Sequence, residues 1–170
     1  MPGGGKSTVG RHLARRLGVT FVDTDDVIEA RIGRPIRSFF ETDGEARFRQ
    51  IESEVLSDLL HEAPGVIATG GGIVLAPGNR EALRRATTCV YLRSTPEELL
   101  RRVRHDTRRP LLQGGDPLVR LQALFAARDS FYRDAAHLVV DAGRSTAHAL
   151  VRHVAWDIER VAAGGDPGGS

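Results

Sequence analysis

Three consecutive glycines, followed by a lysine and two hydroxyl side chains, constrain the fold of this chain more than any other feature. The run Gly3-Gly4-Gly5-Lys6-Ser7-Thr8 fits the end of the phosphate-binding pattern G-x-x-x-x-G-K-[ST]. Lys6 is the only lysine among 24 Lys and Arg residues, and Val9, Leu13 and Leu17 then recur at helical spacing. The sequence therefore predicts a loop that binds phosphate at the start of a helix, with a flexible glycine-rich leader as the alternative.

The phosphate-binding pattern is incomplete on its N-terminal side. Its first glycine would fall one position before Met1, and the apolar strand that feeds such a loop is missing from the printed sequence. Because that strand lies at the centre of a parallel sheet, we expect the central first strand to be absent from the fold. Two explanations stay open: the natural protein begins several residues upstream, with Met1 an internal methionine, or the chain is a damaged copy.

Short β-branched runs alternate with amphipathic segments along the chain. Strands are predicted at residues 19–22, 66–69, 89–92 and 138–140. Between and after them come helical stripes, for example Phe48, Ile51, Val55 and Leu59, and Val151, Val154, Ile158 and Val161. This alternation predicts an α/β fold, a three-layer sandwich with helices on both faces of a parallel sheet. At 170 residues we expect one domain over residues 1–161 and a disordered tail over 162–170.

Composition narrows the class of protein. Hydrophobic residues make up 41% of the chain and charged residues 27%, which is ordinary for a globular protein. No apolar run is long enough to span a membrane, and the N-terminus lacks a signal-peptide pattern. The single cysteine, Cys89, excludes an internal disulfide and is predicted to be a buried residue within a strand. We expect a soluble, cytoplasmic protein that does not bind membranes.

Acidic residues and glycines follow two of the predicted strands. Asp23 and Asp25 come after the first strand, and the two-residue period of a strand would place both on one side with Thr24 pointing away. The three glycines at residues 70–72 follow the second strand, at the sheet edge where ligands bind in open α/β folds. The alternative for the acids is an N-cap of the next helix, which fits Asp26 best.

Six short motifs, taken together and in this order, resemble the shikimate kinase family. They are Gly5-Lys6-Ser7-Thr8-Val9-Gly10-Arg11, Asp23-Thr24-Asp25, Phe48-Arg49-x-Ile51-Glu52, Gly70-Gly71-Gly72, Arg109-Pro110-Leu111-Leu112 and Arg128-x-x-x-Tyr132. The resemblance covers residues 2 to about 160. It implies a P-loop kinase fold and ATP-dependent phosphorylation of the 3-hydroxyl of shikimate, in the route to aromatic amino acids. It also implies a monomer whose partners are shikimate, ATP and Mg²⁺.

For the nucleotide, the resemblance implies a site built around Lys6, which would bridge the phosphates. Arg109 would reach the γ-phosphate from a lid at about residues 106–117, and Arg102 would lie against adenine. Ser7 and Asp23 would hold Mg²⁺. The implied nucleotide-binding residues are Gly3, Gly4, Gly5, Lys6, Ser7, Thr8, Arg102, Arg109 and Ser145. Ser145 belongs to the expected adenine-side loop, where Ala147 replaces a proline that is common in the family.

For the acceptor, the resemblance implies a substrate-binding segment at about residues 25–62. Asp25 would position or deprotonate the attacking hydroxyl and would form the catalytic set with Lys6 and Arg109. Arg49 and Arg128 would capture the carboxylate of shikimate, because a guanidinium fork matches a carboxylate well. The implied acceptor-binding residues are Asp25, Arg49, Gly71, Gly72 and Arg128. The alternative for Arg49 is an ion pair with Glu45 or Glu52 of its own helix.

Three other functions are compatible with parts of the sequence. Another small-metabolite kinase, acting on gluconate or a nucleoside monophosphate, would share the phosphate loop. The incomplete loop also allows a binding remnant without catalytic activity. The arginines between residues 101 and 109 could bind nucleic acid, but Glu97 and Glu98 dilute that charge and no aromatic side chains are interleaved, so we expect no nucleic-acid binding. The histidines lack metal-ligand spacing.

Overall fold

The computed structural model describes residues 5–62, 65–103, 116–143 and 145–162. The predicted tail lies outside the described residues apart from position 162, and so does the predicted lid apart from Asp116 and Pro117. Asp116 accepts a hydrogen bond from the Leu118 N–H at 2.9 Å and caps the helix that begins at Pro117. These two residues therefore form a helix start, as expected where a loop ends.

Helices and strands alternate along the chain, as the sequence predicts. Their bounds are α1 Lys6–Leu17, β1 Thr20–Asp23, α2 Thr24–Ile32, α3 Ile36–Leu60, β2 Gly65–Ala68, the short 3-10 helix η1 Ile73–Leu75, α4 Pro77–Ala86, β3 Val90–Arg93, α5 Pro96–Val103, α6 Pro117–Ala135, β4 Leu138–Asp141 and α7 Ala147–Ala162. Each strand lies within one residue of its predicted position. Cys89 therefore precedes β3 instead of lying within it, and it is half-buried.

The strands pair in parallel, but in two separate sheets. β1 pairs with β2, with Thr20 opposite Gly65, and β3 pairs with β4, with Val90 opposite Leu138. Within the described residues, each sheet has two strands. The predicted α/β fold with parallel strands is confirmed, whereas the absence of a central strand from this fold stays a prediction.

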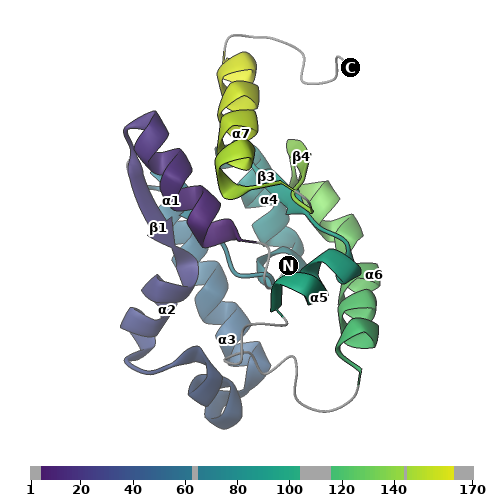
Figure 1. Ribbon diagram of the computed structural model, residues 1–170. Coiled ribbons are helices and arrows are strands. Elements are labelled where there is room, and N and C mark those ends of the chain that lie inside the picture. The colour runs from purple at the N-terminus through teal and green to yellow at the C-terminus, as the bar shows by residue number, and fades with distance from the viewer. Residues whose placement is uncertain (1–4, 63–64, 104–115, 144, 163–170) are drawn as a thin grey trace.

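Helices cover both faces of the strands (Figure 1). On one face α1 lies beside α7, and their side chains Val9, Leu13 and Val154 pack with Val140 of β4. On the other face α3, α4, α5 and α6 surround a second apolar cluster. This cluster includes Tyr91 of β3 and Leu99 of α5. The carboxyl ends of β1 and β2 lie next to each other, close to the starts of α1 and α2 and to α3, and we refer to this region as the cleft.

Helix α3 is bent at Gly44, and the bend directs its second half along the cleft. Gly44 has φ 81° and ψ 169°, values outside the helical region that glycine adopts without steric cost. Beyond it, the predicted stripe of Phe48, Ile51, Val55 and Leu59 is buried. Because this stripe faces the core, its neighbour Arg49 lies at the border of the cleft.

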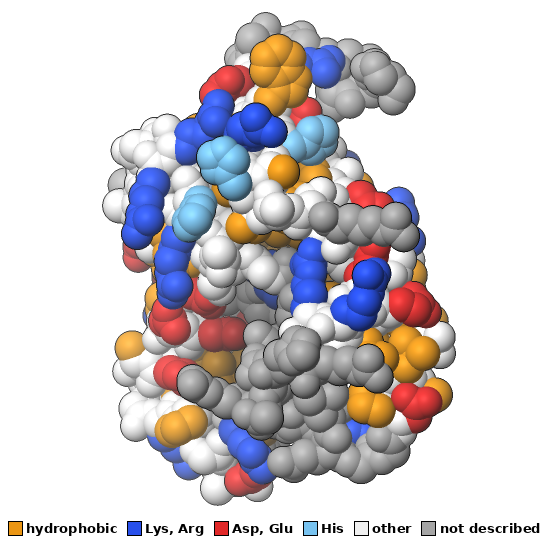
Figure 2. Space-filling view, in the orientation of Figure 1, with side chains coloured by type: hydrophobic (Ala, Val, Ile, Leu, Met, Phe, Trp, Pro, Cys, Tyr) orange, Lys and Arg blue, Asp and Glu red, His pale blue; other side chains and the backbone are white. Residues whose placement is uncertain are grey.

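Charged side chains are scattered over the visible face of the molecule (Figure 2). Basic and histidine side chains gather over α1 and α7, while acidic side chains lie along the α2 side of the central hollow. Within the residues that the structure describes, no helix combines the length and apolar character of a membrane span.

Candidate active site

The first turn of α1 forms the phosphate side of the cleft. Gly5 precedes it with φ 72°, a left-handed conformation that favours glycine, and α1 begins at Lys6. The first turn holds no acidic residue, so the positive end of the helix is available to an anion. Gly5, Lys6, Ser7 and Thr8 thus form the loop end and helix start that the sequence predicts, whereas Gly3 and Gly4 lie outside the described residues.

Ser7 and Asp23 are in direct contact. The Ser7 hydroxyl donates to Asp23 Oδ2 at 2.6 Å, and the other oxygen of Asp23 accepts the Asp25 N–H at 3.0 Å. Asp23 is therefore the last residue of β1 and the N-cap of α2. The alternative that one of these acids caps the next helix therefore holds for Asp23 and not for Asp26, because the helix already begins at Thr24.

Thr24 contacts the glycine loop, contrary to the expectation that it points away. It is fully buried, and its hydroxyl accepts a hydrogen bond from the Gly70 N–H at 3.1 Å. The two-residue period does not extend beyond Asp23, because helical geometry starts at Thr24. The bond joins the start of α2 to the loop after β2.

Asp25 faces the same glycine loop. A Cβ added to Gly70 would lie 2.9 Å from Asp25 Oδ1 and 3.2 Å from Glu52 Oε1, so only glycine leaves room for both carboxyl groups. Although solvent still reaches Asp25, desolvation by the cleft raises the pKa of its carboxyl, the charge of Asp23 raises it further, and the Lys6 ammonium opposes both. Asp25 is thus a better proton acceptor than an ordinary aspartate, within the field of Lys6.

Arg49 makes both of the ion pairs that the sequence allowed and still faces the cleft. Its guanidinium bonds Glu52 at 2.8 Å and Glu45 at 3.1 Å. A Cβ on Gly72 would overlap this guanidinium, so Arg49 lies directly against the loop after β2. The ring of Phe48 lies 5.2 Å below it. Ion pairing and cleft position are therefore compatible, because the planar group has donors on more than one edge.

Glu52 is the buried partner that fixes Arg49. Its side chain is 2% exposed. Burial raises the pKa of the Glu52 carboxyl, against the opposing influence of Arg49. For Arg49, burial alone would lower the pKa, but the bonds to Glu52 and Glu45 outweigh it and the pKa is raised. Arg49 therefore stays charged and is held in one place without a ligand.

Arg128 and Tyr132 of α6 converge on the carbonyl of Gly71. Arg128 donates to this oxygen at 3.3 Å and Tyr132 Oη donates to it at 2.5 Å. The two side chains are four residues apart and so share one face of α6. The structure thus brings Arg49, Arg128, Gly71 and Gly72 together, as predicted for the acceptor site.

Tyr132 has a structural support that sequence reasoning missed. Its ring stacks on Tyr91 with 4.9 Å between centroids, and Tyr91 Oη donates to Asp129 at 2.9 Å. Burial raises the pKa of Tyr132, so the phenol remains a hydrogen-bond donor at neutral pH. The four-residue spacing of Arg128 and Tyr132 could have predicted that both side chains lie on one face of the helix. From the sequence, a role was assigned to Arg128 alone.

The expected adenine side is less completely described. Arg102 of α5 donates to the carbonyls of Ala142 and Gly143, the latter at 3.1 Å. These bonds join α5 to the loop after β4, and Ser145 is exposed on the same loop. Arg102 and Ser145 are therefore brought to one side of the fold, whereas Arg109 lies outside the described residues.

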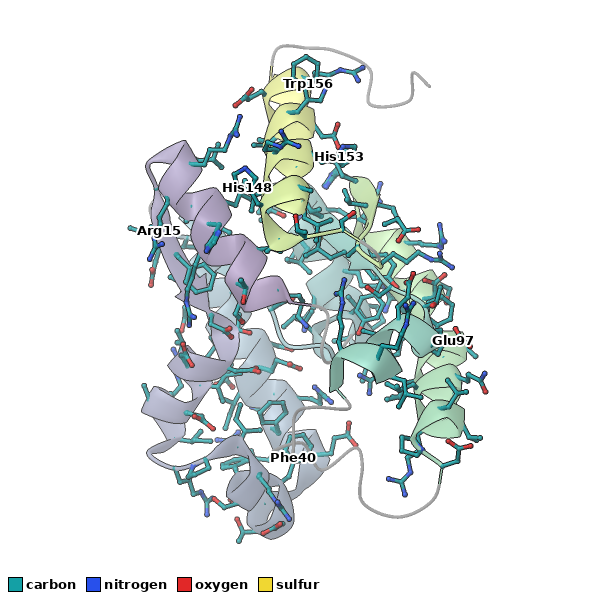
Figure 3. All side chains as sticks on the ribbon, in the orientation of Figure 1. Arg15, Phe40, Glu97, His148, His153 and Trp156 are labelled. Carbon is teal, nitrogen blue, oxygen red and sulfur yellow. The ribbon has the colours of Figure 1, made fainter. Side chains whose placement is uncertain are left out.

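The described residues fit a divalent cation best at Ser7 and Asp23. These are hard oxygen donors in contact, as Mg²⁺ prefers, and a Mg²⁺ site in a kinase takes its remaining ligands from phosphates and water. Among the described residues, His, Cys, Asp and Glu form no metal-binding group of three or more. Figure 3 shows His153 and Trp156 of α7 and Arg15 of α1 directed outward, away from the cleft.

Comparisons with known proteins agree on one family. Residues 2–159 match the sequence model of a family described as shikimate kinase. The chain is 55% identical to the shikimate kinase of Paracidovorax citrulli over 163 residues, which are 94% of this chain and 88% of that protein. It is 48% identical to the shikimate kinase of Burkholderia lata over 157 residues, 92% of this chain and 85% of that one.

Solved structures give the same result. The fold matches a structure of shikimate kinase from Acinetobacter baumannii in complex with shikimate, with a TM-score of 0.83 at 40% identity over 95% of this chain and 88% of that one. It matches the Bacteroides thetaiotaomicron shikimate kinase with a TM-score of 0.86 at 31% identity, over 93% and 94% of the two chains. The ordered motifs, the cleft formed by those motifs that the structure describes, and these matches together show that the chain belongs to the shikimate kinase family.

Proposed function

We propose that this chain transfers the γ-phosphoryl group of ATP to the 3-hydroxyl of shikimate, in the route to aromatic amino acids. The observation that carries the proposal is the convergence of two guanidinium groups on one glycine loop. Arg49 lies against Gly72 and Arg128 bonds Gly71, while Asp25 faces Gly70 and lies within the field of Lys6. Groups that would bind an anionic acceptor and a group that would bind phosphate therefore lie near one carboxylate.

The acceptor carboxylate would bind the two arginines. A guanidinium offers paired N–H donors that match a carboxylate, and Arg49 is already held by the buried Glu52. Since little side-chain entropy remains to be lost on binding, this preorganisation favours affinity. Gly71 and Gly72 would let the ring of the acceptor approach the backbone closely.

Asp25 would orient the acceptor hydroxyl and accept its proton. The hydroxyl oxygen bonds the γ-phosphorus as the bond to the β-phosphate oxygen breaks, ADP leaves and the proton passes to Asp25. The raised pKa of Asp25 suits this role. Lys6 and the N-terminus of α1 would stabilise the phosphoryl charge, as would Arg109, and most of the rate enhancement in such transfers comes from positioning and electrostatics.

The remaining nucleotide contacts belong to the same proposal. Gly3, Gly4, Gly5, Ser7 and Thr8 would bind phosphate oxygens, and Arg102 and Ser145 would bind the adenosine part. Ser7 and Asp23 would hold Mg²⁺, which neutralises charge on the β- and γ-phosphates when bound. We further propose a monomer formed by one domain over residues 1–161, acting in the cytoplasm without nucleic acid or membrane.

A panel of acceptors tests this function. Purified protein is incubated with ATP and Mg²⁺, and ADP release is measured with shikimate, gluconate or a nucleoside monophosphate as acceptor. Of the three acceptors, we expect only shikimate to cause ADP release. We expect this ADP release to stop when Mg²⁺ is replaced by a chelator. Turnover of gluconate or a nucleotide without turnover of shikimate would overturn the assignment. Size-exclusion chromatography with light scattering tests the monomer.

A further inference from the structure

Helix α6 carries two adjacent rows of side chains that contact different parts of the molecule. Arg128 and Tyr132 form one row, and both donate to the Gly71 carbonyl of the loop after β2. Phe125 and Asp129 form the other row, one turn apart, and both contact β3. Neighbouring residues of a helix project about 100° apart, so a contact that fixes the second row also fixes the direction of the first.

Asp129 links α6 to two side chains of β3. Its Oδ1 accepts hydrogen bonds from Tyr91 Oη at 2.9 Å and from Arg93 Nε at 3.3 Å. Tyr91 and Arg93 are two residues apart in β3 and so point to the same face of the strand. Arg93 also lies over the ring of Phe125, with 5.1 Å between its Cζ and the ring centroid. Helix α6 is therefore attached to β3 at two points, one turn apart.

The Asp129 carboxylate is ionised and largely buried. Its side chain is 18% exposed, and its second oxygen, Oδ2, accepts a hydrogen bond from Arg133 at 2.8 Å. Desolvation raises the pKa of this carboxyl, but the hydrogen bonds from Arg133 and Tyr91 outweigh desolvation, and the pKa is lowered. Both oxygens therefore have partners, and the negative charge strengthens the bonds to β3.

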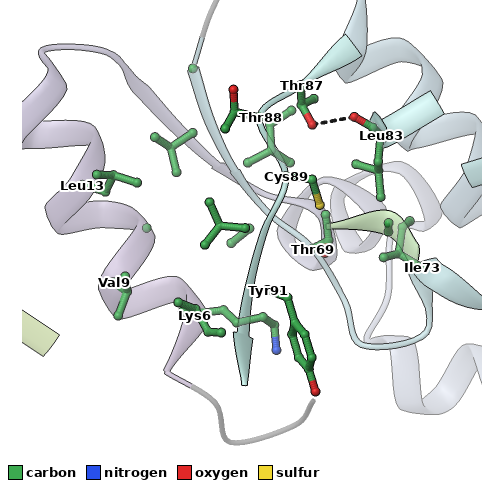
Figure 4. A pocket seen from close by; sticks show the side chains of 18 of the residues that line it. Lys6, Val9, Leu13, Thr69, Ile73, Leu83, Thr87, Thr88, Cys89 and Tyr91 are labelled. Atoms are coloured by element: carbon green, nitrogen blue, oxygen red, sulfur yellow. Dashed lines mark hydrogen bonds between the residues drawn. The ribbon is translucent and has the colours of Figure 1, made fainter. Parts of the chain in front are cut away.

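Tyr91 connects Asp129 to the acceptor site. Its ring extends from β3 on the side away from Val9 of α1, next to a cavity of about 530 Å³ between β2 and β3 (Figure 4). There it stacks on the ring of Tyr132, with 4.9 Å between centroids. Because Tyr132 in turn donates to the Gly71 carbonyl, a continuous series of contacts runs from Asp129 to the glycine loop.

We propose that Asp129 is a positioning residue for the acceptor site: it fixes the rotation of α6 through β3 and so directs Arg128 and Tyr132 at the loop after β2. Since both of its oxygens already bond side chains of the protein, Asp129 acts through these neighbours and not by contact with the acceptor. As far as it concerns shikimate, this inference rests on the proposed function. The contacts of Asp129 lead to the acceptor loop, so its loss should weaken binding of shikimate and not of ATP.

Four single variants of the full chain test the proposal. Asp129→Ala removes both hydrogen bonds to β3, and Tyr91→Phe removes one of them while keeping the stacked ring. Asp129→Asn is the conservative variant, because an amide oxygen can still accept from Tyr91 Oη. Asp134→Ala is the matched control, since it breaks another ion pair of α6, the one with Arg80 at 2.7 Å.

Calorimetry measures the dissociation constants of shikimate and of ATP for each variant. We expect Asp129→Ala to raise the constant for shikimate by at least about fivefold and Tyr91→Phe to raise it by about two- to fivefold, because the two donors to Gly71 are no longer held in place. Asp129→Asn and Asp134→Ala should change it by less than about twofold, and ATP binding should stay the same in all four. If Asp129→Ala lowered the melting temperature but left shikimate binding unchanged, its role would be structural alone and the proposal would be overturned. Equal weakening by Asp134→Ala, or no rescue by Asp129→Asn, would overturn it too.

A second measurement needs no ligand. Amide hydrogen exchange of residues 70–75 should become faster by at least about threefold in Asp129→Ala, because the glycine loop loses the support of α6, and should be unchanged in Asp134→Ala. Equal exchange rates in these two variants would contradict the proposal. If the unaltered chain did not bind shikimate, the proposed function would fail, whereas these exchange rates would still decide whether Asp129 positions the loop.

Discussion

The two walls of the cleft differ in how their charged side chains are partnered. On the α3 wall, formed by Arg49 and Glu52, the charges are paired at 2.8 Å and the charged form of the arginine is favoured. On the α2 wall, formed by Asp23 and Asp25, two carboxyl groups lie close together and ionisation of Asp25 is disfavoured. An arginine held in an ion pair suits the binding of an anion. A carboxyl group next to another carboxyl group has a raised pKa, which suits proton transfer.

The largest effect is expected at the α2 wall, from Asp25→Asn. An amide has the same shape but cannot accept the proton, so kcat should fall by about 10²–10⁴-fold with shikimate. The matched control is Asp26→Asn, which changes an exposed carboxyl in the same helical turn. Steady-state kinetics of both variants measure the effect. If Asp25→Asn retained the wild-type kcat, Asp25 would not be the proton acceptor.

The same variant makes an opposite prediction for stability. The folded-state pKa of Asp25 is raised, so its contribution to stability is full below the ordinary pKa of an aspartate and is lost as pH rises through the raised value. At neutral pH the ionised Asp25 therefore lowers stability, and Asp25→Asn should raise the melting temperature there but not near pH 3. A lower melting temperature for the variant at neutral pH would show that the ionised Asp25 carboxylate stabilises the folded state.

The second-largest effect on activity is expected at the α3 wall, from the Arg49→Ala variant. Loss of a charge-assisted contact of about 1.5–3 kcal/mol should lower kcat/KM for shikimate by about 10- to 100-fold, mainly through KM. The variant should also melt at lower temperature, because Glu52 is left buried without its partner. Arg37→Ala is the control, since its pair with Glu41 is exposed and lies in the same helix. Unchanged KM in Arg49→Ala would remove this arginine from the acceptor site.

A smaller effect is expected where the α3 wall meets the glycine loop, from Gly72→Ala. The added methyl group overlaps the Arg49 guanidinium, which is the movable end of a side chain, so KM for shikimate should rise by about tenfold with little change in stability. Gly78→Ala is the matched control, because a Cβ there meets nothing within 4 Å. The double variant with Arg49→Ala should cost no more than Arg49→Ala alone; additive losses would mean that Gly72 acts independently of Arg49.

The smallest effect is expected from Tyr132→Phe. It removes the hydrogen bond to the Gly71 carbonyl, worth about 0.5–1.5 kcal/mol, and keeps the stacking on Tyr91. KM for shikimate should rise by about two- to tenfold while KM for ATP is unchanged. Steady-state kinetics with shikimate and with ATP varied in turn, compared with the Phe131→Leu variant on the neighbouring face of α6, measure both KM values. An equal effect on ATP would indicate a general loss of packing.

Local patterns in the chain were enough to predict much of the fold. Strand positions were correct within one residue, because β-branched runs bounded by turns need no distant information. The stripe at Phe48, Ile51, Val55 and Leu59 was correctly assigned to the core for the same reason. The error at Thr24 arose at the end of β1, because helical geometry begins there and the alternating directions of strand side chains no longer apply.

The sequence by itself determined the strands and helices, the start of α1 after Gly5, and the residues proposed for the acceptor site, since these depend on local spacing and on ordered motifs. Only the tertiary structure decided that Arg49 keeps both ion pairs while facing the cleft, that Tyr132 supports Gly71, and that an apolar cavity separates β2 from β3. These features join residues far apart in the chain. Their energies depend on distance and burial, which no local pattern records.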